Sequence, residues 1–96
     1  MPSPWWLYMI ECRGGGIYIG ITDDVDRRYG EHAAGTGARY TRLNPPERLL
    51  AKREFPNRKS AAQEEYRMKR LSVLEKRQWA WALGVRPNEL SDFSDS

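Results

Sequence analysis

The 96-residue sequence contains one cysteine and one histidine and has no long hydrophobic run. A single Cys12 cannot form an internal disulfide, and the chain offers no further cysteine or histidine cluster for a zinc site, so a reducing compartment is favoured. The N-terminal residues lack the pattern of a secretory signal. The longest apolar stretch, Trp5 to Ile10, is far shorter than the roughly 20 residues of a membrane span. We therefore expect a cytoplasmic protein without a membrane partner.

What the sequence does contain fits one small, basic domain. Hydrophobic residues make up 40% of the chain and charged residues 30%, which excludes a disordered or membrane-embedded chain. The net charge is +3, yet three acidic residues lie in the last eight positions, so residues 1–86 carry 16 basic and 10 acidic side chains and a charge of +6. Arginine-rich surfaces suit polyanions, although many proteins without such partners are equally basic.

The first 22 residues are typical of a β-hairpin. Residues 5–12 and 17–22 are rich in aromatic and β-branched side chains, and the glycines between them indicate a turn. Because three consecutive glycines select no single turn type, the register of the two strands stays open.

A helix is predicted over residues 24–34, followed by an ordered surface loop over 35–46. Thr22 and Asp23 offer N-cap oxygens for this helix. Gly30 costs about 1 kcal/mol relative to alanine, so either packing or a close backbone contact should justify it.

The second half of the sequence predicts one more strand and two more helices. Residues 47–55 could form either a strand or a helical turn, and we favour the strand. Ser72 and Glu75 form a capping box, which marks the start of a helix. The expected elements are a strand over 47–55, a helix over 57–71, a helix from 72 to 84, and an acidic tail over 85–96. We expect an α+β domain over residues 5–84, with a three-stranded antiparallel sheet flanked by helices in the order ββαβαα.

Glu65 falls on the apolar stripe of the second predicted helix, together with Ala61, Ala62 and Met68. An unpaired carboxylate on a packed face is expensive, so a positive group should meet it. An arginine or a bound metal ion would serve, and periodicity alone gives neither more weight.

Arg28 and His32 are spaced i, i+4 on the first predicted helix, beside its apolar edge. Both could face one site. Considered one at a time, each residue has a commoner structural explanation: Arg28 could extend its charged end to solvent along the sheet, and His32 could be a packed side chain.

Four segments together resemble the GIY-YIG nuclease family: residues 6–12, Tyr18-Ile19-Gly20, the run 21–28 with His32, and 65–69. The string Gly16-Ile17-Tyr18 spells GIY but overlaps the second motif. The first motif is therefore Leu7-Tyr8-Met9 in degenerate form. The resemblance covers about residues 5–72 and is greatest to small stand-alone bacterial members. It extends to the nuclease half of structure-specific endonucleases, whose zinc-binding module has no counterpart here.

The resemblance implies five catalytic residues: Tyr8, Tyr18, Arg28, His32 and Glu65. Glu65 would bind one Mg²⁺ or Mn²⁺ ion, and Arg28 would hold a nonbridging phosphate oxygen. Tyr8 would take the proton of the attacking water, which requires nearby cations to lower its pKa from about 10. Tyr18 would orient water or phosphate. His32 would accept a proton or contact phosphate, and the tasks of Tyr8 and His32 are interchangeable at this point.

The same resemblance implies a nucleic-acid surface. Its expected contacts are Arg27, Arg39, Tyr40, Thr41, Arg42 and Lys69, although residues 39–42 would look the same in a solvated loop. The predicted function is metal-dependent endonuclease cleavage of DNA, selective for structure rather than sequence, in DNA repair or processing. RNA as substrate and the oligomeric state stay open, and no small organic cofactor is expected. A catalytically weak nucleic-acid-binding module is the alternative, and a protein-interaction adaptor is a more distant one.

Overall fold

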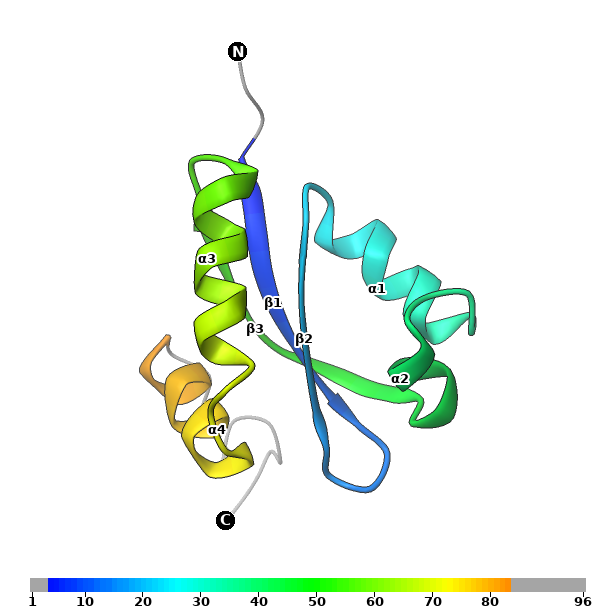
Figure 1. Ribbon diagram of the computed structural model, residues 1–96. Helices are drawn as coiled ribbons and strands as arrows, with labels where there is room; N and C mark the ends of the chain where they lie inside the picture. Colours follow the sequence, from blue (N-terminus) through cyan, green and yellow to red (C-terminus); the bar gives the residue numbers. More distant parts are fainter. Residues whose placement is uncertain (1–3, 84–96) are drawn as a thin grey trace.

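The computed structural model describes residues 4–83 of the chain and places them in a three-layer arrangement (Figure 1). The elements are β1 (Trp5–Cys12), β2 (Ile17–Thr22), α1 (Val25–Ala33), α2 (Arg39–Leu43), β3 (Pro46–Phe55), α3 (Arg58–Met68) and α4 (Val73–Ala82). The strands form an antiparallel sheet in the order β2-β1-β3. Helices α3 and α4 cover one face, and α1 and α2 cover the other. The expected α+β fold is confirmed.

The hairpin has a register that the sequence left open. Tyr8 of β1 pairs with Gly20 of β2, and Ile10 pairs with Tyr18. The turn is made by Gly14 and Gly15 with φ of +90° and +89°, a backbone region that costs glycine little. Because side chains two residues apart share a face, Tyr8 and Tyr18 project from the same side of the sheet, diagonally across the two strands.

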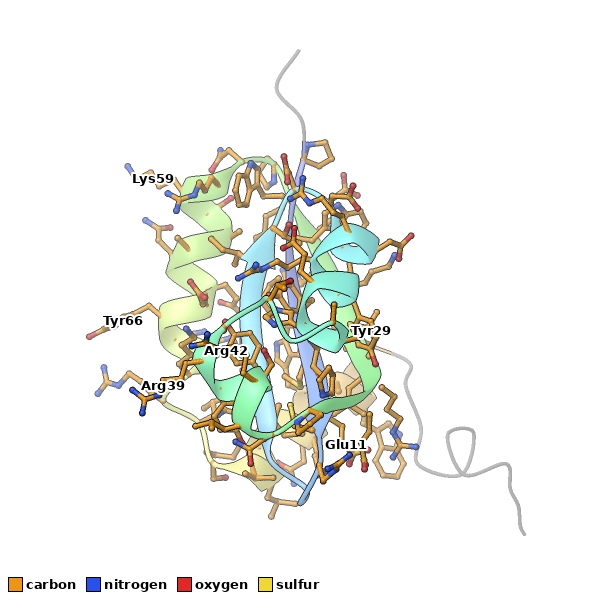
Figure 2. All side chains as sticks on the ribbon, turned by 90° about the vertical axis from the view of Figure 1, so that its right-hand side faces the viewer. Glu11, Tyr29, Arg39, Arg42, Lys59 and Tyr66 are labelled. Atoms are coloured by element: carbon orange, nitrogen blue, oxygen red, sulfur yellow. The ribbon has the colours of Figure 1, made fainter. Side chains whose placement is uncertain are left out.

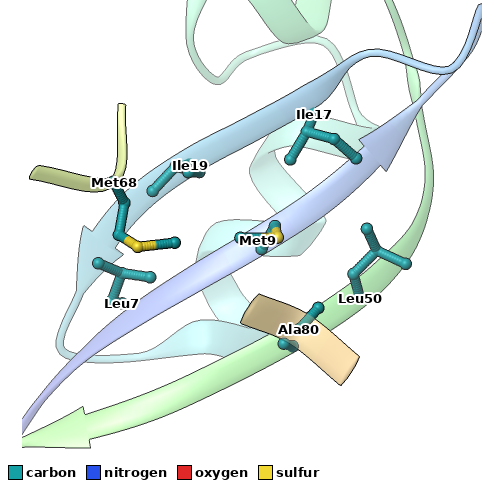
Figure 3. Close-up of a cluster of buried hydrophobic side chains, with 8 residues drawn as sticks. Leu7, Met9, Ile17, Ile19, Leu50, Met68 and Ala80 are labelled. Carbon is teal, nitrogen blue, oxygen red and sulfur yellow. The ribbon is translucent and has the colours of Figure 1, made fainter. Parts of the chain in front are cut away.

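The central strand β1 is covered on both faces. Leu7 and Met9 belong to a cluster under α3 and α4 (Figure 3), which also contains Ile17, Ile19, Leu50, Ala51, Met68 and Ala80. Tyr8, Ile10 and Cys12 point the other way and pack with Val25 of α1. Two-sided burial explains why residues 5–12 show no alternation of apolar and polar side chains.

Local capping sets the helix starts. Asp24 caps α1 by accepting a hydrogen bond from the Arg27 N–H, so the cap is neither Thr22 nor Asp23, the two residues expected. Asn57 caps α3, and the Ser72–Glu75 capping box of α4 is present in both directions. Helix α3 ends at Met68, earlier than residue 71. Gly84 and the acidic tail over 85–96 lie outside the described residues.

Gly30 has no close contact. A Cβ built there meets nothing within 4 Å, so of the two explanations, packing of the helix or a close contact at the glycine, only packing remains. Helix α1 tolerates it because Val25 and His32 on either side are buried.

The segment expected to be a loop contains the one-turn helix α2. Its residue Thr41 is 1% exposed, and its side chain contacts both α1 and the backbone of Ala38. Tertiary contacts of this kind, rather than intrinsic propensity, hold so short a helix.

An ion-pair cluster fixes α4 to the sheet. Arg77 of α4 lies 2.7 Å from Glu11 of β1 and donates to the carbonyl of Gly15 in the β1–β2 turn at 3.1 Å. Arg48 of β3 approaches the other carboxylate oxygen of Glu11, also at 2.7 Å.

Candidate active site

A chain of three buried side chains connects β1, α1 and α2. The Tyr8 hydroxyl lies 2.8 Å from Nε2 of His32, and Nδ1 of His32 lies 2.7 Å from Oγ1 of Thr41. Thr41 in turn donates to the Ala38 carbonyl at 2.9 Å. Each of the three side chains is 1% exposed, so the hydrogen bonds between them are almost entirely shielded from bulk water.

The Thr41 hydroxyl determines which His32 nitrogen carries the hydrogen. Thr41 has a single O–H, which it donates to the Ala38 carbonyl, so its oxygen accepts from Nδ1–H of His32. Nε2 is then a free acceptor for the Tyr8 O–H. The opposite tautomer would give up the bond to Ala38. This arrangement therefore aims an unprotonated imidazole nitrogen at the Tyr8 hydroxyl.

Tyr18 of β2 completes an aromatic group around His32. Its ring centroid is 5.0 Å from that of His32 and 6.3 Å from that of Tyr8. Tyr40 of α2 stacks on the outer side of Tyr18, at 6.0 Å with the rings inclined by 22°. Tyr40 is 40% exposed, so the group runs from the buried Tyr8 to the surface.

Burial and charge act on the proton affinities of Tyr8 and His32. Desolvation raises the pKa of Tyr8 to about 12; a negative charge on Tyr18 would add to this, while the Arg28 guanidinium acts in the lowering direction. Arg28 does lower the pKa of Tyr8, as expected of a nearby cation. Burial raises this pKa by more, so the net shift is upward. Desolvation and Arg28 also lower the pKa of His32. At neutral pH the pair is a neutral phenol and a neutral imidazole.

Arg28 lies at the edge of this group. Its guanidinium is 2.8 Å from a carboxylate oxygen of Glu31, one turn along α1, and this hydrogen bond raises the pKa of Arg28 and lowers that of Glu31. The Arg28 side chain is 33% exposed, which leaves its guanidinium accessible to an anion from solution.

Glu65 of α3 meets a cation beside Tyr18. Its carboxylate lies 3.2 Å from the ammonium of Lys69, and that ammonium lies 5.9 Å from the centre of the Tyr18 ring. Helix α3 packs across β1 and β2, so these side chains flank β2, the edge strand of the sheet. Figure 1 shows β2 running between α3 on one side and α1 and α2 on the other.

The side chain of Glu65 offers one ligand of the type that hard divalent cations take, a carboxylate. The carboxylate is 23% exposed, and the Lys69 ammonium shows that its oxygens already face a positive charge. Within residues 4–83 no group of three or more His, Cys, Asp or Glu side chains is gathered for a metal. A cation held at Glu65 would therefore take its remaining oxygens from water and substrate, as Mg²⁺ commonly does.

Two glycines leave room for the chain of buried side chains. A Cβ on Gly20 would lie 2.4 Å from the Tyr8 hydroxyl oxygen, and a Cβ on Gly37 would lie 2.4 Å from Nδ1 of His32. Both positions require the absence of a side chain, because the atoms they would strike are fixed by hydrogen bonds. The sequence pattern gave no sign of the Gly37 contact.

The expected nucleic-acid contacts divide into exposed and buried residues. Arg39 and Arg42 extend from α2 at the surface (Figure 2), and Tyr40 and Lys69 are partly exposed. Arg27 is exposed and lies 3.2 Å from Asp23. Thr41 differs from the expectation, because its hydroxyl is buried and is engaged by His32 and Ala38, so it is not free to meet a phosphate.

Comparison with known proteins gives a consistent set of relatives. Residues 4–78 match the family model of the GIY-YIG catalytic domain. The chain is 46% identical over 88 residues to a UPF0213 protein of Xanthomonas campestris pv. campestris strain 8004, spanning 92% of this chain and 86% of that protein. It is 49% identical over 72 residues to a UPF0213 protein of Cupriavidus pinatubonensis, spanning 75% and 80% respectively.

Two solution structures are similar in fold. The UPF0213 protein of Bacillus halodurans is 40% identical, with a TM-score of 0.58 over 97% of this chain and 99% of that one. A protein of E. faecalis is 29% identical, with a TM-score of 0.59 over 100% and 99%. Among the helices of residues 4–83, none combines the length and apolar character needed to cross a bilayer.

Proposed function

Because the chain belongs to the GIY-YIG family, whose members are nucleases, we propose that it is a divalent-metal-dependent endonuclease that hydrolyses phosphodiester bonds of DNA. The observation that carries the proposal is the convergence of Tyr8, Tyr18, His32 and Arg28 on one side of the sheet, with Glu65 beside the same strand edge. The family gives a nucleic-acid substrate, and the choice of DNA, in repair or processing, is part of the proposal. The single reduced cysteine makes the cytoplasm the proposed location.

Tyr8 takes the proton of the attacking water and passes its own proton to His32. A phenol whose pKa is about 12 is a poor base alone, since the phenolate is scarcely populated at neutral pH. The 2.8 Å contact with Nε2 removes that difficulty, because the hydroxyl gives up one proton as it receives another. Nδ1–H stays bonded to Thr41 throughout. This relay gives His32 the task of proton acceptor, in preference to the phosphate contact that was the other expectation.

Arg28 and Tyr18 position the phosphate. The Arg28 guanidinium holds a nonbridging oxygen and stabilises the charge that grows on it as water attacks. Tyr18 lies between His32 and the Lys69 ammonium, where its hydroxyl orients the water or the phosphate. Glu65 would hold one Mg²⁺ or Mn²⁺ ion, which would supply positive charge to the phosphate and the leaving oxygen when bound.

The experiment is a cleavage assay on duplex, flap and junction DNA with Mg²⁺ or Mn²⁺. Glu65→Gln keeps the shape of the side chain and removes its charge, and Arg28→Ala removes the phosphate contact, so both should stop nicking while remaining folded by circular dichroism. A loss of about 100- to 1000-fold is expected for Arg28→Ala. The matched controls are Glu54→Gln on β3, the opposite edge of the sheet, and Arg13→Ala in the β1–β2 turn.

A catalytically weak nucleic-acid-binding module is the second candidate, favoured by the exposed basic residues of α2. Salt-sensitive binding of DNA, with no cleavage product in Mg²⁺ or Mn²⁺, would support this candidate and refute the enzyme proposal. Full activity in Glu65→Gln or Arg28→Ala would remove the assignment of that residue.

A further inference from the structure

Helix α3 carries a shallow groove on a face that the proposed catalytic groups do not use. The groove is lined by Arg58, Lys59, Ala62, Gln63 and Tyr66. These residues recur at intervals of three and four along α3, so they form one stripe on its outer surface. Figure 2 shows Lys59 and Tyr66 projecting outward from α3 at the margin of the molecule.

The aromatic residue in this groove has an exposed ring. Tyr66 is 70% exposed, more than any other tyrosine among residues 4–83. The guanidinium of Arg70, one turn further on, lies over the Tyr66 ring at 5.9 Å from its centre. An exposed ring with a cation beside it is the arrangement on which an unpaired nucleobase stacks, because stacking uses the π-face and the cation contacts the neighbouring phosphate.

The basic residues along the groove form no ion pair among residues 4–83, whereas the charges of Glu64 and Glu65 on α3 are offset by basic partners. Glu64 is paired with Arg67 and Glu65 with Lys69. Within residues 4–83, no ion pair involves Arg58, Lys59 or Arg70. The outer stripe of α3 is therefore a net positive surface interrupted by one aromatic ring.

The groove adjoins the proposed catalytic groups along the helix. Tyr66 directly follows Glu65, and Arg70 directly follows Lys69, so the two faces of α3 share a border. A strand whose phosphate is held at Glu65 could therefore continue along α3 into this groove.

We propose that the α3 groove, lined by residues 58–66, is a second nucleic-acid site that takes an unpaired nucleotide of the substrate strand. Its base stacks on Tyr66, and Lys59 and Arg70 contact the adjoining phosphates. A base inside a duplex already stacks on its neighbours and is not available to Tyr66. The substrate class is thus nucleic acid with unpaired nucleotides beside the cleaved bond. The proposal rests on the proposed function for the position of that bond, while the binding itself is independent of cleavage.

The test measures binding to protein carrying Glu65→Gln, which is expected not to cut. Two DNA probes have the same sequence, and each carries 2-aminopurine, once in a single-stranded flap and once in a full duplex. We expect the flap probe to bind with quenched fluorescence. Adding Tyr66→Ala should weaken its binding by about 5- to 150-fold, while Tyr66→Phe should not. Binding of the duplex probe should be unchanged by either substitution.

Matched surface substitutions serve as controls. Trp81→Ala removes another half-exposed aromatic ring, on α4, and should leave binding of both probes unaltered. Lys59→Ala should reduce the salt dependence of flap binding by about one released ion, while Lys76→Ala on α4 should not.

Each remaining outcome has one meaning. Unchanged flap binding in Tyr66→Ala, or an equal loss on flap and duplex, overturns the stacking site and leaves the groove to another partner. Flap binding that depends on Tyr66 in a protein that never cuts would retain this inference and remove the proposed function. If the unaltered protein cleaves DNA and Tyr66→Ala has no effect on flap binding, the proposed function stands and the stacking site is refuted. If the protein binds neither probe, both proposals are refuted.

Discussion

Nε2 of His32 lies 2.8 Å from the hydroxyl oxygen of Tyr8, and both side chains are 1% exposed. This contact joins a central strand to a helix on the covering layer. It also allows the buried Tyr8 hydroxyl, whose pKa is high, to pass its proton to His32. Neither residue could transfer this proton without the other.

Tyr8→Phe should abolish most cleavage while leaving the fold intact. The change removes the hydroxyl that relays the proton, so a loss of about 100- to 10,000-fold is expected in single-turnover cleavage. Stability should fall by only about 1 kcal/mol, the net value of one hydrogen bond. Tyr29→Phe on α1 (Figure 2) is the matched control and should cleave normally. A Tyr8→Phe protein with undiminished activity would show that this hydroxyl takes no part in the reaction.

Cleavage should depend on pH through His32. Burial, then Arg28, holds the pKa of His32 below its ordinary value of 6.5, and the relay needs unprotonated Nε2. Activity should therefore vary little from pH 8 down to about 6.5 on account of this residue. It should fall only at lower pH, as His32 takes up a proton. The measurement is the pH profile of single-turnover cleavage beside an NMR titration of His32, and a His32 pKa above 6.5 would contradict the assignment.

The same shift predicts a loss of stability in acid. The unfolded chain has a histidine of ordinary pKa, so it binds more protons than the folded chain between that value and the lower folded pKa. The free energy of unfolding should then decrease as pH drops below about 6.5, and stop decreasing through this group below the folded pKa. Urea midpoints over this range measure the effect, and His32→Gln should lack that component.

Thr41→Val should disturb the relay without touching substrate. It removes the acceptor of the Nδ1–H hydrogen bond, so the imidazole loses its fixed tautomer and orientation. Cleavage should fall by up to about 100-fold, the scale of a misplaced catalytic group. The unsatisfied N–H should cost about 1–3 kcal/mol of stability. Thr41→Ser keeps the hydroxyl and should restore activity, and ¹⁵N shifts of the His32 ring should report the change of tautomer in Thr41→Val alone.

Two glycine substitutions should have opposite effects. In Gly20→Ala the new methyl would strike the Tyr8 hydroxyl, which is held by His32, so we expect about 1–3 kcal/mol of destabilisation and reduced cleavage. In Gly30→Ala the methyl meets open space within α1, so the helix should gain about 0.5–1 kcal/mol and cleavage should be retained. Denaturant unfolding of both proteins makes the comparison. Equal stabilities would mean that the Tyr8 hydroxyl can move aside.

Much of the fold followed from local chemistry in the sequence. The hairpin, the third strand and the capping box at Ser72 rest on side-chain patterns and turn residues that act over a few positions. The register between β1 and β2 could not be predicted, because three glycines fit several turns. Helix α2 could not be predicted either, since its stability depends on a tertiary hydrogen bond between Thr41 and His32 of the preceding helix α1.

The sequence was sufficient to identify the residues of the candidate site, but not to predict their burial or the contacts between them. Tyr8, His32 and Arg28 were selected by spacing and resemblance, but the burial of Tyr8 and His32 was not predicted. Burial makes Tyr8 a weak base alone, and it holds the Thr41 hydroxyl against His32 and Ala38, which is why we propose that Thr41 positions His32. Such effects arise from packing among elements far apart in sequence, which periodicity does not encode.

Strand β2 has a hydrogen-bonded neighbour on one side only. The groups proposed to act on the phosphate flank that open margin rather than the floor of an enclosed cavity. A polymer can thus be laid against them sideways, at any point along its length, and need not be threaded from a terminus. A covalently closed circle would meet the same side chains as a linear fragment, which is the access that an internal cut demands.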